Sequence, residues 1–393
     1  MTLLNDPRPI SADSHALEGP EVFAGLPERF GDDAPRVVHK EGQGDYITIP
    51  NNPKRSRNVA VMALAGTRLD YATPLPREHA SKPSAGSIED PEIQAYFTGG
   101  YAAMRPGLTD GARRPEDQDI DGVSAEILYP GWFPMFSLPN LDLLVALQRN
   151  YNDWMHSQQT ASKGRLVGLA ALPVQQPELA AAELERVIKL GFKGIVIPSN
   201  APRGRRYSDD DYEPMWALAE EAGLPVAFHV ACMSHAPDWL KASSERDPIV
   251  QYAGSSALIH DTMIELMVRG VCARHPRLKF VLAEFNAGWV AHWLDKVQQG
   301  WAREYARDSS STPPVDVLEI WKRQFYATIE DDTAALRTRD LIGEATLLWG
   351  SDYPHTDSTW PCSSQVLDEM FESYSPESRD KITRTNVANL YSL

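Results

Sequence analysis

The chain has 393 residues, with 38 lysines and arginines against 54 aspartates and glutamates, so its formal net charge is −16. This excess of negative charge argues against nucleic-acid binding and against attachment to an anionic membrane surface, because both need a basic face. The hydrophobic fraction of 42% is ordinary for a globular protein, and no apolar run is long enough to span a membrane. The length suits one large α/β barrel or two medium domains.

Three cysteines, Cys232, Cys272 and Cys362, lie far apart and form no CxxC motif. A disulfide framework and a thiolate zinc site are therefore not expected. The first fifteen residues lack the basic and apolar regions of a signal peptide. Together these features predict a cytoplasmic protein.

Short apolar runs alternate with longer amphipathic stretches along most of the chain, and eight of the runs are typical of buried parallel strands. The predicted strands are residues 10–15, 123–130, 166–173, 194–199, 225–230, 279–285, 323–329 and 345–352. The predicted helices are residues 178–190, 208–222, 257–273 and 286–301.

Eight strands alternating with helices favour a closed (β/α)8 TIM barrel over an open doubly wound sheet. No GxGxxG motif follows a predicted strand, which argues against a dinucleotide-binding fold. We therefore expect an α/β protein in which residues 1–393 form a single metal-dependent TIM-barrel domain.

Residues 19–114 break this rhythm, because they are rich in Pro, Gly, Asp and Arg and contain few periodic segments. We interpret them as a long insertion after the first barrel strand. Loops that follow barrel strands lie at the catalytic face, so this insertion is predicted to form a lid or a substrate wall. A structural excursion or an arm between subunits is the alternative.

Polar residues stand at the carboxyl ends of four predicted strands, where side chains of a parallel barrel converge on one mouth. Alternation within the first strand places Asp13 and His15 on the same face. Carboxylates gathered in one buried mouth need a cation to offset their repulsion, so these residues predict a metal site. The strand-end set is Asp13, His15, His229, Glu284 and Asp352.

Glu18 and His260 lie close enough in sequence to reach the same mouth. The enlarged set exceeds the four ligands of a tetrahedral zinc, and its oxygen-rich character suits iron or manganese. The predicted metal ligands are Asp13, His15, Glu18, His229, His260, Glu284 and Asp352. Two metals fit this count. In the competing single-metal interpretation, Glu284 is a general base, and Glu18 and His260 orient ligands through hydrogen bonds.

These motifs resemble the amidohydrolase-related family that includes aminocarboxymuconate-semialdehyde decarboxylase and the resorcylate decarboxylases. Its members are (β/α)8 barrels with an HxH, DxH or ExH pair on the first strand, a His on the fifth strand and an Asp on the eighth. Asp13-x-His15, His229 and Asp352 match these places, and residues 165–198 and 347–361 are similar as well. The resemblance covers residues 11–15 and the chain from about residue 119 onward, and the insertion only weakly.

The chain also departs from the family pattern. Decarboxylase members carry a catalytic His on the sixth strand, where this chain has Glu284 within AEFNAGW. No Lys ends the fourth strand, so a carbamylated-lysine two-zinc centre is not expected. The combination of DSHxxE, AEFNAGW and SDYPH is more similar to a branch that includes TIM-barrel nonheme diiron monooxygenases of diterpenoid antibiotic biosynthesis.

The branch implies two Fe ions, O2 and an external electron donor. Barrels of the wider amidohydrolase-related family are often dimers, so a homodimer is also considered. The expected reaction is hydroxylation of an unactivated C–H bond of an apolar, CoA-linked, diterpenoid-like small molecule. Aromatic residues of the mouth loops are then predicted to line the substrate pocket, although each could equally be ordinary packing. Two arginines are predicted to bind CoA phosphates, or else to be solvated surface. The predicted substrate-binding residues are Tyr129, Trp132, Phe133, Trp360, Arg205 and Arg206.

The alternative hypothesis is a hydrolase or decarboxylase with one Zn2+ or Mn2+. In this hypothesis the catalytic residue is Glu284 or His355, acting as a base on metal-bound water or as an acid on a substrate carbon.

Overall fold

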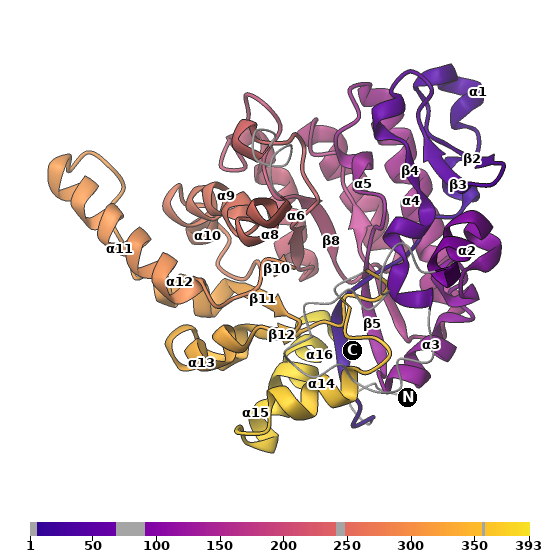
Figure 1. Cartoon of the computed structure of the whole chain (residues 1–393). Helices are drawn as coiled ribbons and strands as arrows, with labels where there is room; N and C mark the ends of the chain where they lie inside the picture. Colours follow the sequence, from indigo (N-terminus) through magenta and orange to yellow (C-terminus); the bar gives the residue numbers. More distant parts are fainter. Residues whose placement is uncertain (1–5, 68–90, 241–247, 356–357) are drawn as a thin grey trace. The chain divides into compact units, whose positions relative to one another are not determined.

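The computed structural model describes residues 6–67, 91–240, 248–355 and 358–393 (Figure 1). It contains two compact units. The first unit comprises residues 1–171, 349–388 and 393. The second comprises residues 172–348 and 389–392.

The first unit contains a parallel sheet in the order β1-β5-β6, formed by β1 (Ile10–His15), β5 (Ala125–Tyr129) and β6 (Leu166–Gly168). Every residue of β1 is buried, although three of the six are Ser or Asp. The register places His15 beside Tyr129, so the ends of β1 and β5 coincide. The remaining strand and main helices are β7 (Ala170–Ala171), α3 (Arg114–Asp121), α4 (Leu141–Ala161), α14 (Ser363–Met370) and α15 (Pro376–Asp380). The last helix, α16 (Asn386–Tyr391), has residues in both units.

Between β1 and β5 the chain forms a second, antiparallel sheet from β2 (Arg36–Lys40), β3 (Gly44–Thr48) and β4 (Arg57–Asn58). Short helices α1 (Leu26–Phe30) and α2 (Pro91–Gly99) accompany it. A Cβ at Gly44 would collide with the Phe97 backbone oxygen of α2, and Gly44 has φ +83°. Glycine is therefore needed where α2 crosses this sheet. The insertion predicted after the first strand thus has its own ordered sheet.

The second unit is built on parallel strands β8 (Ile195–Pro198), β9 (Val226–His229), β10 (Phe280–Ala283) and β11 (Phe325–Ile329), followed by β12 (Leu347–Trp349). Its apolar strand residues are almost completely buried, as expected for parallel strands covered on both faces. The helices are α5 (Pro177–Leu190), α6 (Glu213–Ala222), α8 (Pro248–Ala253), α9 (Ala257–Val268), α10 (Val271–Arg274), α11 (Val290–Arg307), α12 (Val317–Gln324) and α13 (Thr333–Ile342).

Each of the eight predicted strands coincides with an observed strand, and the first agrees residue for residue. The predicted helix 257–273 is divided into α9 and α10 because Gly270 takes φ +92° between them. The predicted helix 286–301 begins later, at Val290, because Asn286 takes a positive φ. Across the described ranges, none of the helices combines the length and apolarity needed to cross a bilayer.

Candidate metal centre

Three potential metal ligands of the first unit gather where β1 ends and the chain leaves β12. His15, Asp352 and His355 each offer one ligand atom, and these atoms lie within 4.8 Å of one another. Asp352 Oδ1 lies 3.2 Å from His15 Nε2 and 2.9 Å from His355 Nδ1. The two imidazoles stack with their centroids 3.8 Å apart. Asp13 Oδ1 lies farther away, 3.9 Å from His15 Nε2.

The protonation of His15 follows from its other ring nitrogen. Nδ1 lies 2.9 Å from the carbonyl oxygen of Pro130. A carbonyl can only accept a hydrogen bond, so Nδ1 carries the proton, and Nε2 of the neutral ring presents its lone pair to Asp352. A lone pair and a carboxylate oxygen 3.2 Å apart repel each other unless a cation, either a proton or a metal ion, lies between them. Metal-binding histidines are typically oriented by such a hydrogen bond.

Asp352 is completely buried, and its backbone is unusual. Its Oδ1 faces the rings of His15 and His355 and accepts a hydrogen bond from whichever facing nitrogen is protonated. Burial opposes ionisation, but positive charge on the neighbouring imidazoles of His355 and His15 prevails and holds the pKa of this carboxyl well below its ordinary value. The residue takes φ +55°, and its backbone N–H donates to the Asp13 carbonyl. An anionic carboxylate in this setting fits a divalent cation.

Glu18 is also completely buried in the first unit, but its surroundings differ. Its Oε1 accepts a hydrogen bond from the backbone N–H of Gly131 at 3.0 Å. A Cβ at position 131 would collide with the Ala16 carbonyl, so only glycine allows this approach. Burial raises the pKa of Glu18 to about 7. Among the described residues, it is not part of the close group of ligand atoms.

In the second unit, His229 and Glu284 form a contact at neighbouring strand ends. The register of β9 and β10 pairs His229 with Ala283, so Glu284 follows directly. His229 Nε2 lies 3.0 Å from Glu284 Oε2, and the Glu284 side chain keeps 23% of its surface exposed. Its backbone N–H donates to Thr328 Oγ1, and its φ is +62°. This pair joins an imidazole to a carboxylate with access to water.

His260 occupies an aromatic environment on α9 of the second unit. Its ring centroid lies 4.7 Å from that of Trp289 and 5.5 Å from that of Trp293. Burial lowers the pKa of His260, which favours the neutral ring. The structure therefore places this predicted ligand between indoles, and none of the described close ligand groups includes it.

The four aromatic residues predicted to bind substrate all lie in the first unit. Tyr129 and Phe133 contact the His15 ring, at centroid distances of 6.0 and 5.7 Å. Trp132 and Trp360 are buried against other aromatic rings, Phe23 and Tyr353 respectively. Tyr129 and Phe133 thus adjoin the candidate metal centre, whereas the two tryptophans pack beside neighbouring rings.

The two arginines predicted to bind phosphate lie in the second unit. Arg205 forms an ion pair with Asp211 at 2.9 Å, with 34% and 61% of the two side chains exposed. The backbone N–H of Arg206 donates to Asp209. Local carboxylates thus contact this basic segment.

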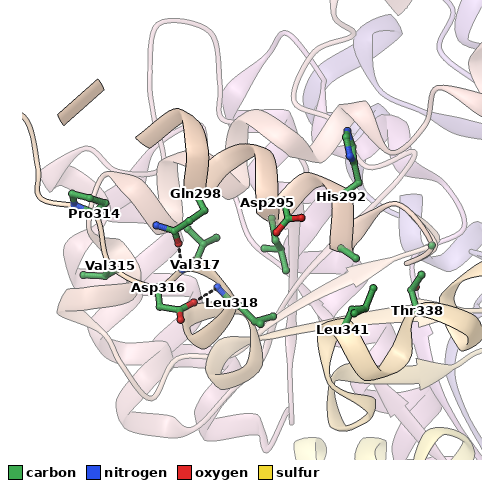
Figure 2. Close-up of a pocket in the computed structure, with 13 residues that line it drawn as sticks. His292, Asp295, Gln298, Pro314, Val315, Asp316, Val317, Leu318, Thr338 and Leu341 are labelled. Carbon is green, nitrogen blue, oxygen red and sulfur yellow. Dashed lines mark hydrogen bonds between the residues drawn. The ribbon is translucent and has the colours of Figure 1, made fainter. Parts of the chain in front are cut away.

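A groove of about 860 Å³ lies in the second unit between α11, the segment before α12, and α13 (Figure 2). Its polar lining includes His292, Asp295, Gln298 and Thr338, and Gln298 Oε1 accepts a hydrogen bond from the Val317 backbone. None of the residues predicted to form the site lines this groove. The cavity and the candidate metal centre are therefore separate features.

The structure reveals contributions that residue types alone do not indicate. The Pro130 carbonyl that orients His15 is a backbone atom. Ser11 Oγ accepts a hydrogen bond from the Ser351 backbone N–H at 2.8 Å, and it contacts the hydroxyls of Ser14 and Ser351. The sequence did contain an indication of these hydroxyl contacts, because Ser11 and Ser14 are polar residues within a predicted buried strand.

The model of the amidohydrolase family matches residues 136–393, about two thirds of the chain. The chain belongs to the amidohydrolase family. Among its relatives, the gamma-resorcylate decarboxylase of Polaromonas sp. (strain JS666 / ATCC BAA-500) is 28% identical over 328 residues, covering 79% of this chain and 94% of the relative.

Solved structures of amidohydrolases agree with the fold. An amidohydrolase from Mycobacterium avium subsp. paratuberculosis K-10 matches with a TM-score of 0.74 and 19% identity, covering 98% of each chain. The dihydroxybenzoic acid decarboxylase of Polaromonas sp. JS666, with bound manganese and the inhibitor 2-nitroresorcinol, matches with a TM-score of 0.61 and 20% identity, covering 84% of this chain and 93% of that one. The predicted α/β fold of the TIM-barrel type, with an insertion after the first strand, is confirmed.

The comparisons contradict the oxygen-activating hypothesis. Curated relatives are named as decarboxylases, and the solved Polaromonas decarboxylase holds manganese. The predictions of a diiron monooxygenase, of two Fe ions, of O2 and an electron donor, and of a CoA-linked diterpenoid substrate were therefore wrong. The prediction of a small-molecule substrate agrees with these relatives.

The physical reason for the error lies in counting ligands. Seven candidate ligands suggested two metals only if all of them faced one centre. Instead, Glu18 Oε1 accepts a hydrogen bond from the Gly131 backbone N–H, indole rings flank His260, and neither residue belongs to a close group of ligand atoms among the described residues.

Proposed function

We propose that this amidohydrolase is a metal-dependent decarboxylase that acts on a small aromatic carboxylic acid with one divalent ion, Mn2+ or Zn2+. One observation carries the proposal: the His15 Nε2 lone pair faces the buried Asp352 carboxylate at 3.2 Å, while Nδ1 is committed to Pro130. A divalent cation fits this pair of donors. The names of the relatives support the reaction class.

In this proposal, Asp13, His15 and Asp352 hold the ion in the first unit. That His229 is also a metal ligand stays a prediction from the sequence. When bound, such an ion supplies Lewis acidity, which orients and polarises an oxygen-bearing substrate.

Decarboxylation replaces a carboxylate on a ring carbon with hydrogen: the C–C bond breaks, CO2 leaves, and a proton is added to the carbon. The protein must therefore hold a proton beside the substrate. His355 is suited to this role, because its Nδ1 contacts Asp352 at 2.9 Å and 20% of its side chain stays exposed. Phe133, edge-on to His15 at 5.7 Å, supplies an aromatic wall nearby.

The test uses metal-stripped protein reloaded with Mn2+ and supplied with 2,6-dihydroxybenzoate and related hydroxybenzoates. We expect CO2 release with formation of the decarboxylated phenol, and one deuterium on the ring when the reaction runs in D2O. His355→Gln should retain Mn2+ but lose at least about 100-fold in turnover. Absence of CO2 release across the panel, with Mn2+ or Zn2+ bound, would overturn the proposal.

A metal-dependent hydrolase is the second candidate, favoured by one observation. Glu284 is a carboxylate with access to water and lies 3.0 Å from His229 Nε2, a setting suited to a general base. Reactions in H2(18)O distinguish the two functions, because hydrolysis places 18O in the organic product, whereas decarboxylation adds only hydrogen to the ring of the phenol.

Two further predictions rest on the sequence. The cytoplasmic location follows from the usage of the three cysteines. Residues 19–114 are proposed to act as a lid or substrate wall within a single barrel domain.

A further inference from the structure

The first unit contains a buried ion pair that the proposed chemistry does not use. Arg114, at the start of α3, has only 1% of its side chain exposed, and Glu126 lies on β5. Two hydrogen bonds join them: Nε donates to Oε2 at 2.8 Å and Nη2 donates to Oε1 at 2.9 Å. Gln118 adds a third donor to the same carboxylate at 2.8 Å.

Stability alone does not account for such a pair. Moving two charges out of water costs several kcal/mol per ion, and apolar replacements of buried pairs are often neutral or stabilising, by about 1–4 kcal/mol. A buried arginine of this kind is therefore better explained by the other groups to which its planar guanidinium donates hydrogen bonds.

The guanidinium also holds the segment that carries Asp352. Arg114 Nη2 donates to the Tyr353 carbonyl at 3.1 Å, and the His15 backbone N–H donates to the same oxygen at 2.7 Å. The Arg114 guanidinium lies 4.4 Å from the centroid of the Tyr353 ring. One carbonyl thus links the arginine, the end of β1 and the residue that follows Asp352.

Asp352 needs such a constraint, because its φ of +55° lies in the left-handed region. A non-glycine residue there costs of order 1 kcal/mol and persists only where its surroundings enforce it. Hydrogen bonds hold the backbone at Asp352 and at the residue after it. The Asp352 N–H donates to the Asp13 carbonyl, and the Tyr353 carbonyl accepts a hydrogen bond from Arg114.

The Tyr353 side chain is held as well. Its hydroxyl donates a hydrogen bond to Asp117 Oδ2 at 2.9 Å, and Asp117 Oδ1 accepts a hydrogen bond from Arg105 Nε at 2.7 Å. The ring stacks on Trp360 with centroids 4.8 Å apart. These contacts fix the ring, whereas Arg114 alone among these side chains binds the carbonyl next to Asp352.

We propose that Arg114 is a positioning residue: through the Tyr353 carbonyl it holds the Asp352 carboxylate in place for metal binding. The inference rests on the proposed function, because it assumes that Asp352 is a metal ligand. Arg114 itself contacts neither metal nor substrate.

The test measures Mn2+ binding to metal-stripped protein by electron paramagnetic resonance of the free ion, which does not depend on turnover. The double variant Arg114→Met/Glu126→Gln removes both buried charges together, so no uncompensated charge remains. We expect its Mn2+ Kd to rise at least about 10-fold, as for other groups that orient metal ligands. Unfolding by urea in EDTA reports separately on stability.

Gln118→Met is the matched control, because it removes a donor from the same Glu126 carboxylate without a contact to Tyr353. Its Mn2+ Kd should stay within about twofold of the wild-type value. Arg114→Lys keeps the positive charge but loses the planar, two-pronged set of N–H donors, so its Mn2+ Kd should be intermediate. This variant replaces the double variant if the double variant fails to fold.

The outcomes separate the two proposals. If Asp352→Asn weakens Mn2+ binding but folded Arg114→Met/Glu126→Gln and Arg114→Lys bind like wild type, the positioning role is wrong and the metal site stands. If Asp352→Asn binds Mn2+ like wild type, the metal site itself is wrong.

Discussion

Two imidazole–carboxylate contacts of similar length occur in different units. They differ in the burial of the carboxylate and in the cation that must lie between nitrogen and oxygen. In the first unit, His15 faces Asp352 at 3.2 Å, the carboxylate is buried, and the imidazole proton is committed to Pro130. In the second unit, His229 faces Glu284 at 3.0 Å, and the carboxylate keeps contact with water. One proton on Nε2 satisfies the second pair, whereas the first needs an additional cation. A short contact is therefore evidence for a metal only when burial and the second ring nitrogen are considered with it.

The strongest test of the difference between the two contacts is to neutralise each carboxylate in turn. Asp352→Asn should raise the Mn2+ Kd by more than about 100-fold, because it removes the buried negative charge next to His15. Glu284→Gln should raise the Kd by less than about 10-fold. Isothermal titration of both variants with Mn2+ checks the difference, and equal losses would show that the two contacts are equivalent.

Metal removal should have the next largest effect. With Mn2+ present at a hundred times its Kd, EDTA should lower the free energy of unfolding by about 3 kcal/mol, because the ion binds only the folded state. Urea denaturation with and without EDTA measures this change. Asp352→Asn should show no comparable response, and an EDTA effect of full size in that variant would place the metal elsewhere.

A third prediction asks whether buried carboxylates of the first unit share this dependence on protons or cations. Burial raises the pKa of Asp121 to about 7 from 3.8, although Ser363 donates two hydrogen bonds to it. The folded protein therefore keeps a proton that the unfolded chain loses at lower pH. Stability should fall as the pH rises from about 4 to 7, by at most about 1.4 kcal/mol per pH unit.

Asp121→Asn removes this titration. Urea unfolding at pH 5, 6 and 7 in EDTA should show the variant gaining on the wild type at each step. Parallel pH profiles of the two proteins would contradict the prediction.

The smallest effect is expected for the solvent-exposed ion pair between Arg205 and Asp211. Arg205→Ala breaks the solvated ion pair with Asp211 and should change the free energy of unfolding by less than about 1 kcal/mol. Thermal unfolding at low and high salt measures it. A larger loss would mean that Arg205 has a partner beyond Asp211.

The fold was predictable because apolar runs report burial and because parallel strands bring their ends to one edge. Hence the sequence alone located Asp13 and His15 on β1 and His229 at the end of β9. Glu284 directly follows β10, and Asp352 lies three residues beyond the end of β12. The orienting groups were not predictable, since the carbonyls of Pro130 and Tyr353 belong to backbone that every residue carries. The number of metals was misjudged for a related reason: spacing along the chain contains no information on where Glu18 and His260 turn.

The first unit joins two segments that lie far apart in the sequence. Ser11 and Asp13 bind the backbone of Ser351 and Asp352, across 340 and 339 positions of sequence. During synthesis, β1 leaves the ribosome long before its partners exist, with its serines and aspartate still in water. Contacts this distant in sequence form late and slow folding. Metal capture should therefore be among the last events in the maturation of this protein, and a chain that stops before residue 351 should leave the ribosome unable to bind the ion.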